Sequence, residues 1–215
     1  QALMAQHAPD ELQLVIADGK RFEFMSFNGS VYLPSFMRGR IATEVSELQA
    51  ACESLWCEIE KRKAIFEQHK VYSLDRLTKK TGIRLPVFVL FIDEYSIFLN
   101  AGFEERILMD ILRLGAGLGV YVINSTQRAD ADTIKKTNFS TVVSYRLANS
   151  GEAQVLFGKQ EPYHVLKVAS QGELVALGVG LDYEHLKGFY VDKDPDDDLG
   201  AAGGDGPAVL TPAEP

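Results

Sequence analysis

Residues 86–94 read Pro86-Val-Phe-Val-Leu-Phe-Ile-Asp93-Glu94, and this stretch decides the fold. Six apolar residues follow the proline, and two adjacent carboxylates end the run. A short continuous apolar run of this kind is typical of a strand buried on both faces of a parallel sheet. Such a strand carries its last residues to the carboxyl edge of the sheet, where ligands bind in α/β proteins.

Similar apolar runs recur along the chain and alternate with helical patterns. Because alternating strands and helices build a mostly parallel sheet covered on both faces, the predicted fold class is α/β. The other predicted strands are residues 12–17, 120–124, 141–147, 165–168 and 174–177, and the predicted helices are residues 43–69, 103–114, 131–136 and 150–156.

The helix predicted over Thr43–His69 has the clearest pattern. Thr43 is a good capping residue, and apolar residues recur at helical spacing from Val45 to Phe66. The intervening charged residues are expected to form a solvated face; they are Glu58, Glu60, Lys61, Arg62 and Lys63.

Length and charge indicate one domain with a tail. The chain has 215 residues and a formal net charge of −8, and the excess acid is concentrated after residue 191. Residues 1–191 are predicted to form the domain, and the Asp, Gly, Ala and Pro of residues 192–215 a disordered tail. The net charge neither supports nor excludes a nucleic-acid partner, because binding depends on where basic residues gather and not on the sum of the charges.

The sequence contains no apolar stretch long enough to cross a membrane, and its first residues do not resemble a signal peptide. Its two cysteines, Cys52 and Cys57, lie five apart in the predicted helix and do not face a common ligand position. We interpret both as reduced thiols, as in a cytoplasmic protein.

The paired acids predict phosphoryl-transfer chemistry on a nucleoside triphosphate. Asp93 is placed to orient the water shell of Mg²⁺ bound to ATP, and Glu94 to polarise the attacking water. The alternative is a strand followed by an acidic helix cap. Residues 120–128 repeat the arrangement, because another apolar strand ends in Ser125-Thr-Gln127-Arg128. An amide there is placed to sense a γ-phosphate, and the alternative is a polar turn.

Together these segments resemble the FtsK/SpoIIIE family of motor proteins. The family's Walker B strand ends in Asp-Glu, as at Asp93-Glu94, and its next strand runs into Ala-Thr-Gln-Arg-Pro, where this chain has residues 125–129, Ser-Thr-Gln-Arg-Ala. Weaker matches, in the same order, are residues 15–20 (Val-Ile-Ala-Asp-Gly-Lys), 141–149, 156–159, 172–174 and 186–191. The resemblance covers nearly all of residues 1–191.

The resemblance implies a RecA-like P-loop ATPase core that binds ATP and Mg²⁺ and assembles as a hexameric ring to move double-stranded DNA. Asp93, Thr126 and Gln127 then bind the nucleotide and metal, and Asp93, Glu94 and Gln127 are catalytic. It also implies a cytoplasmic motor, with any membrane tether in parts outside this chain.

The chain departs from the family in two places. It contains no Gly-x-x-x-x-Gly-Lys-Ser/Thr phosphate loop, so we expect it to begin just after that loop. The glycines of residues 115–119 precede a strand, whereas a phosphate loop follows one. Ala116 also stands where many relatives carry an arginine that reaches a neighbouring subunit's phosphate. The candidates to replace it are Arg113, Arg128 and Arg146.

The molecule that the motor moves is the property that the sequence indicates least clearly. Lys135 and Lys136 follow the Gln-bearing strand and are the candidates for sequence-independent contacts to DNA phosphates, although solvated lysines on a short helix are equally consistent. Two alternatives stay open. One is a secretion or conjugation ATPase that moves protein or nucleoprotein, and the other is a degenerate scaffold that does not hydrolyse ATP.

Overall fold

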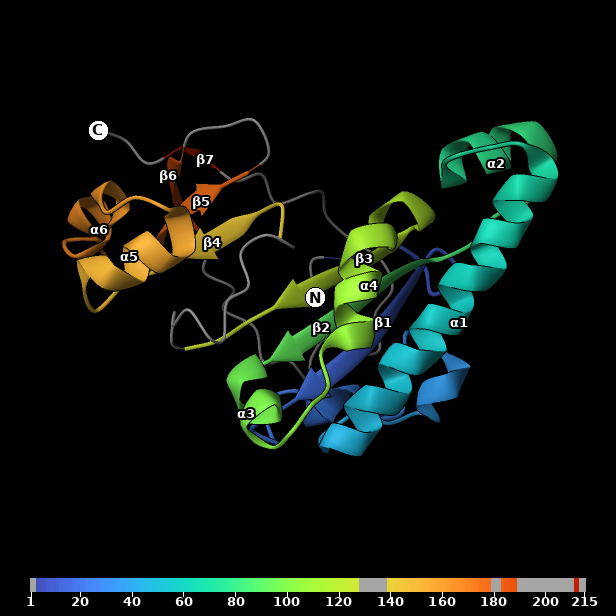
Figure 1. The fold of residues 1–215 in the computed structure, drawn as a ribbon, viewed down its shortest axis with the longest axis horizontal. Helices are drawn as coiled ribbons and strands as arrows, with labels where there is room; N and C mark the ends of the chain where they lie inside the picture. Colours follow the sequence, from blue (N-terminus) through green and yellow to red (C-terminus); the bar gives the residue numbers. More distant parts are fainter. Residues whose placement is uncertain (1–2, 128–138, 179–182, 189–210, 213–215) are drawn as a thin grey trace. The chain divides into compact units, whose positions relative to one another are not determined.

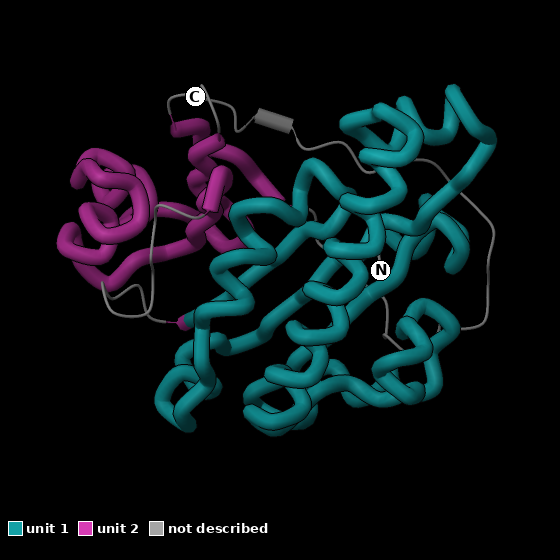
Figure 2. Tube along the Cα trace, turned by 45° about the vertical axis from the view of Figure 1, so that its right-hand side comes forward, with its two compact units in different colours: residues 1–126, 195–204 teal, residues 127–194, 205–215 magenta. Residues whose placement is uncertain are grey.

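The computed structural model describes residues 3–127, 139–178, 183–188 and 211–212. These residues fall into two compact units, one ending at Thr126 and the other beginning at Gln127 (Figure 2). We describe each unit by itself.

The first unit is built on a three-stranded parallel sheet in the order β1-β2-β3 (Figure 1). The strands are β1 (Leu12–Asp18), β2 (Val87–Asp93) and β3 (Val120–Asn124). Asp18 pairs with Asp93, and Ile92 pairs with Asn124. The carboxyl ends of all three strands therefore meet at one edge of the sheet, and the predicted α/β class is confirmed.

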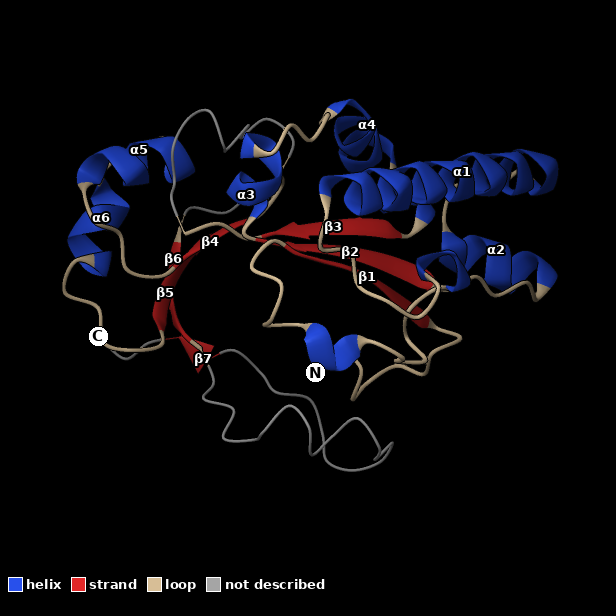
Figure 3. Cartoon of the chain, turned by 90° about the horizontal axis from the view of Figure 1, so that it is seen from below, coloured by secondary structure: helices blue, strands red, loops and turns tan. Residues whose placement is uncertain are grey.

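One face of this sheet is covered by α1 (Val45–His69) and α4 (Arg106–Leu114), as Figure 3 shows. Alternate strand residues such as Val15, Leu90 and Val120 are buried beneath these helices. Two short helices were not predicted from the sequence. They are α2 (Leu74–Thr81), which follows α1, and α3 (Tyr95–Asn100), which begins directly after the paired acids.

The opposite face of β1 and β2 is covered by residues 24–41, which contain two 3₁₀ turns, η1 (Met25–Phe27) and η2 (Ser35–Met37). Phe24 contacts Phe91 there with ring centroids 5.0 Å apart. In the described residues this face therefore has 3₁₀ turns and loops where α-helices were expected.

The prediction that Arg62 lies on the solvated face of α1 is wrong, because its side chain is completely buried. Its guanidinium donates to the carbonyl oxygens of Leu118 and Pro86, both at 2.7 Å, and to Glu58 Oε1 at 3.0 Å. It also lies 4.9 Å from the ring centre of Phe88. A buried arginine needs such partners, and these bonds fasten α1 to the amino ends of β2 and β3.

The second unit is an antiparallel sheet in the order β4-β5-β6-β7 with two helices. Its elements are β4 (Val142–Ser144), α5 (Ser150–Phe157), α6 (Glu161–Leu166), β5 (Glu173–Leu177), β6 (Glu184–Lys187) and β7 (Thr211–Pro212). The strand predicted over residues 165–168 is wrong. Pro162 favours the start of a helix, and Leu166 ends that helix buried in this unit's core.

Two predictions fall largely outside the described residues. The helix predicted over residues 131–136 lies there entirely, and so does the tail of residues 192–215 apart from β7. Both stay predictions.

Candidate active site

The paired acids lie where β2 leaves the sheet. Asp93 is the last residue of β2, and Glu94 adopts the left-handed conformation, with φ 49° and ψ 60°. This conformation costs a non-glycine residue of order 1–3 kcal/mol and persists only where the surroundings enforce it. Glu94 occupies the N-cap position of α3, but its side chain makes no capping hydrogen bond to that helix. The acidic-cap alternative therefore does not account for its carboxylate.

Hydroxyl groups hold both carboxylates. Ser125 Oγ donates to Asp93 Oδ1 at 2.6 Å, and Thr126 Oγ1 donates to Glu94 Oε1 at 3.3 Å. Ser96, on α3, donates to the same Glu94 oxygen at 2.7 Å. The tips of β2 and β3 are thus joined by side chains as well as by the sheet, and the two carboxylates are oriented.

The second oxygen of Asp93 has no partner among the described residues. Asp93 Oδ2 is buried, and within the described residues no group donates to it. Burial raises the pKa of Asp93, and the bond from Ser125 opposes that rise. A buried carboxylate oxygen without a donor fits the water shell of a magnesium ion, since Mg²⁺ prefers carboxylate oxygens and keeps several of its waters.

A third acid lies beside these two but is committed to the backbone. Asp18 is fully buried at the end of β1. Its carboxylate accepts from the backbone N–H groups of Lys20, Arg21 and Phe24, at 2.9, 2.9 and 3.1 Å. The turn after β1 is fixed in this way, and Lys20 Nζ pairs there with Glu23 Oε1 at 2.9 Å. Asp18 is therefore a structural residue of this edge.

The remaining predicted site residues are placed as follows. Gln127 is exposed and directly follows Thr126, where the second unit begins. Arg113 is exposed in the last turn of α4, with Asp110 3.4 Å away. Arg146 is exposed in the second unit, shortly after β4. Three others lie outside the described residues; they are Arg128, Lys135 and Lys136.

The glycines of residues 115–119 join α4 to β3 at the amino end of that strand, through the turn η3 (Ala116–Leu118). A Cβ on Gly115 would lie 2.6 Å from the carbonyl oxygen of Val120, and one on Gly119 would collide with Leu74. Gly119 also has a φ of +75°. These two glycines are required by packing at the edge opposite Asp93, which explains them without a phosphate. Ala116 is exposed.

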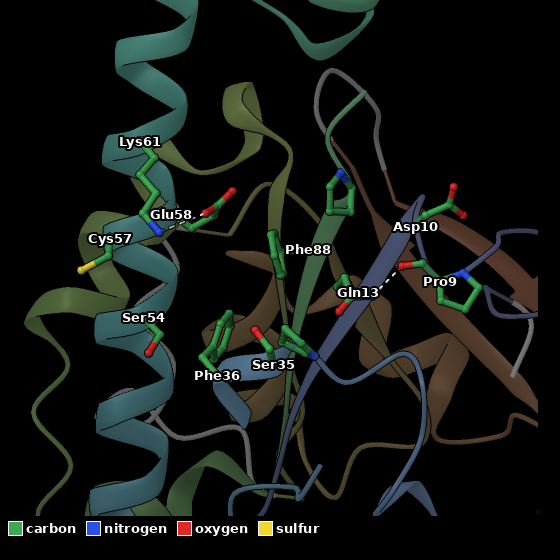
Figure 4. Close-up of a pocket in the computed structure, with 12 residues that line it drawn as sticks. Pro9, Asp10, Gln13, Ser35, Phe36, Ser54, Cys57, Glu58, Lys61 and Phe88 are labelled. Atoms are coloured by element: carbon green, nitrogen blue, oxygen red, sulfur yellow. Dashed lines mark hydrogen bonds and ion pairs between the residues drawn. The ribbon is translucent and has the colours of Figure 1, made fainter. Parts of the chain in front are cut away.

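A pocket of about 630 Å³ also lies at the amino end of the strands (Figure 4). Its walls come from α1, η2 and the residues that lead into β1 and β2; they include Phe36, Phe88, Glu58 and Lys61. Because β2 separates Phe88 from Asp93, this pocket is distinct from the carboxylate site.

Sequence reasoning identified the acids but missed the groups that hold them. Ser125 and Ser96 were not proposed, and neither was the Lys20–Glu23 pair beside Asp93. Ser125 had a signal in the sequence, because it is the first residue after a strand predicted to neighbour β2. A parallel register would have placed it opposite the acids.

The parallel sheet, with paired acids at its carboxyl edge, is typical of RecA-like ATPase cores, and the chain contains part of such a core. The chain belongs to the FtsK/SpoIIIE family, whose profile matches residues 1–144. Among curated proteins, the chain is 25% identical over 171 residues to the DNA translocase FtsK of Borreliella burgdorferi, covering 73% of this chain and 21% of that protein. It is also 25% identical over 158 residues to the type VII secretion system protein EssC of Staphylococcus aureus, covering 71% of this chain and 10% of that one.

Solved structures agree on the fold. The cytoplasmic domain of the type VII secretion ATPase EccC of Thermomonospora curvata matches with a TM-score of 0.71 and 22% identity, over 90% of this chain and 24% of that one. The pCW3 conjugation coupling protein TcpA, determined with ATPγS, matches with a TM-score of 0.68 and 19% identity, over 86% and 54% of the two chains. No helix among the described residues has the length and apolarity needed to span a bilayer.

Proposed function

We propose that this chain is the acid-bearing part of an ATP-driven motor that translocates double-stranded DNA as a ring, six-membered as the family resemblance implies. The observation that carries the proposal is the strand-tip arrangement, in which the hydroxyls of the two residues after β3 orient Asp93 and Glu94, while no group among the described residues donates to Asp93 Oδ2. Membership of the FtsK/SpoIIIE family and similarity to a DNA translocase support the choice of reaction and cargo.

In the proposed reaction, Glu94 accepts the proton of a water molecule as its oxygen attacks the γ-phosphorus. The bond between that phosphorus and the bridging oxygen breaks, and ADP and inorganic phosphate leave. Asp93 accepts a hydrogen bond at Oδ2 from the metal's water shell. Mg²⁺, when bound with ATP, neutralises phosphate charge. Thr126 and Gln127 contact the nucleotide, and Gln127 reports its γ-phosphate to the segment that follows.

The phosphate loop has to come from outside residues 1–215, because the sequence contains none. We propose that the strand preceding the phosphate loop pairs with the open side of β3. In the described residues β3 pairs only with β2, and Tyr121 and Ile123 are 48% and 45% exposed on it. Asn124 Oδ1, also on β3, is buried without a partner. An unpaired strand edge with exposed apolar side chains accepts a further strand.

The proposal is tested on the longer protein that includes the upstream segment, by measuring ATP hydrolysis with and without double-stranded DNA. DNA is expected to stimulate turnover. Glu94→Gln should reduce the maximal rate by about 100-fold or more and leave nucleotide binding intact, because it removes the general base. Glu104→Gln is the matched control, since Glu104 is an exposed glutamate near α4.

Each contrary result has its own meaning. Unchanged turnover in Glu94→Gln would remove the catalytic role of that residue. A longer protein that binds no nucleotide would favour the scaffold alternative. Hydrolysis that DNA does not stimulate would favour a secretion or conjugation ATPase, a candidate that the similarity to EssC and EccC supports.

A further inference from the structure

Ser125 contacts four consecutive residues around the acidic turn. Its N–H donates to the carbonyl oxygen of Ile92 at 2.9 Å, and its own carbonyl oxygen accepts from the N–H of Tyr95 at 2.9 Å. Its hydroxyl donates to Asp93 Oδ1 at 2.6 Å and lies 3.4 Å from the N–H of Glu94. One residue at the end of β3 therefore spans the whole turn from β2 into α3.

The backbone and hydroxyl contacts of Ser125 have different consequences. The two backbone bonds continue the sheet past its last pair and are available to any residue type other than proline. The hydroxyl bond to Asp93 requires a hydroxyl group on Cβ, which only serine and threonine provide.

The hydroxyl bond fixes the orientation of the Asp93 carboxylate. The terminal torsion of an aspartate is broad, so an unheld Asp93 would sample a range of orientations. The short bond from Ser125 occupies Oδ1, and Oδ2 is left as the buried acceptor without a donor. The same contact joins β3, which continues into Thr126 and Gln127, to the acid at the tip of β2.

We propose that Ser125 is a positioning residue of the hydrolysis site, whose hydroxyl fixes the orientation of Asp93 and ties it to the strand that leads into Gln127. The inference rests on the proposed function. It assigns to Ser125 no contact with nucleotide or metal, since its effect passes through Asp93.

The test uses the longer protein with its upstream segment and compares Ser125→Ala with Ser125→Thr. Loss of hydrogen bonds that orient metal-binding groups typically costs 10–100-fold in metal affinity or activity. We expect Ser125→Ala to lower the maximal ATPase rate and raise the half-saturating Mg²⁺ concentration, each by about 10-fold. Ser125→Thr keeps the hydroxyl and should restore both values.

Binding of a fluorescent ATP analogue gives a readout that does not depend on turnover. Ser125→Ala should lose most of the extra affinity that Mg²⁺ confers and keep the affinity measured in EDTA. Ser54→Ala is the matched control, because Ser54 lies on α1 and its hydroxyl donates only to Ala50, within the same helix, at 2.8 Å. Thermal melting of every variant shows whether it is folded.

The outcomes separate the two proposals. Wild-type turnover together with an unaffected Ser125→Ala would overturn this inference alone. Equal losses with and without Mg²⁺, or no rescue by a folded Ser125→Thr, would show that Ser125 supports the fold and does not position Asp93. A wild-type protein that neither binds nor hydrolyses ATP would remove the proposed function, and this inference with it.

Discussion

The backbone of Glu94 has a conformation that glutamate rarely adopts, and its neighbours show how it is held. Thr126 and Ser96 bind its carboxylate. A Cβ on Gly19 would lie 3.2 Å from the carbonyl oxygens of both Asp93 and Glu94, so the turn after β1 approaches this strained residue as closely as a glycine permits. Strain of this kind concentrates at functional sites, where the surrounding structure compensates for it.

At the scale of single residues, the two thiols are expected to react very differently. Cys52 is fully buried, and burial raises its pKa to about 12, whereas Cys57 is exposed. Because the thiolate is the reactive form, a thiol reagent at pH 8 should modify one cysteine of the native chain quickly and both only after denaturation. Mass spectrometry of the labelled peptides checks this. Rapid native labelling of Cys52 would contradict the packing of α1.

The sequence alone could predict the two acids but not the residues that hydrogen-bond to them. Asp93 and Glu94 could be predicted because an apolar strand ends at them. The bond from Ser125 to Asp93 depends on which strands are neighbours and in which register. That information is three-dimensional, because hydrogen bonds between residues about 30 apart leave no local pattern.

Helix α1 depends on one buried charge. We expect Arg62→Met to lower the free energy of unfolding by about 3–5 kcal/mol, since it leaves the carbonyl oxygens of Leu118 and Pro86 buried without their donor. Urea denaturation measures the change. Lys61→Met is the matched control on the exposed side of the same helix and should change stability by less than about 1 kcal/mol. Equal effects would mean that Arg62 is solvated, as its sequence pattern suggested.

The first turn of α1 is expected to make stability depend on pH. Glu47 accepts from the backbone N–H groups of Thr43 and Glu44, at 2.8 and 3.1 Å. The bond from Thr43 is the main cause that lowers the pKa of Glu47 below its ordinary 4.5. A lowered folded-state pKa contributes stability that is present above the unfolded-state pKa and is lost as the pH falls through the folded-state value.

Glu47→Gln should therefore destabilise the chain by about 0.3–1 kcal/mol at pH 7, the usual range for a negative charge in the first turn of a helix. The difference from wild type should shrink as the pH falls below about 4.5, where the wild-type carboxylate takes up its proton. Unfolding curves at pH 7 and near pH 3 give the comparison. A difference that stays constant over this range would show that the charge of Glu47 plays no part.

For the molecule as a whole, the open side of β3 is the feature to test. Ser125 N–H points to β2, so the alternation of a strand points the N–H groups of Val122 and Asn124 to the open side. If an upstream strand pairs there, hydrogen exchange at these two amides should slow by at least about 10-fold in the longer protein relative to residues 1–215. Amides of β2, which already has two neighbours, are the internal control. Unchanged exchange at Val122 and Asn124 would place the phosphate loop elsewhere.

The sequence by itself determined the α/β class, the three parallel strands to within a residue or two, the long helix, and the paired acids at a strand tip. These follow from local patterns, because burial on both faces requires a continuous apolar run and a helix repeats every 3.6 residues. Only the tertiary structure decided that Arg62 is buried, that residues 165–168 do not form a strand, and that Ser125 holds Asp93. The burial of Arg62 and the bond of Ser125 depend on side chains far apart in the chain, whose partners are set by packing and strand register. The helix that ends at Leu166 depends on the burial of that residue in the core of its unit.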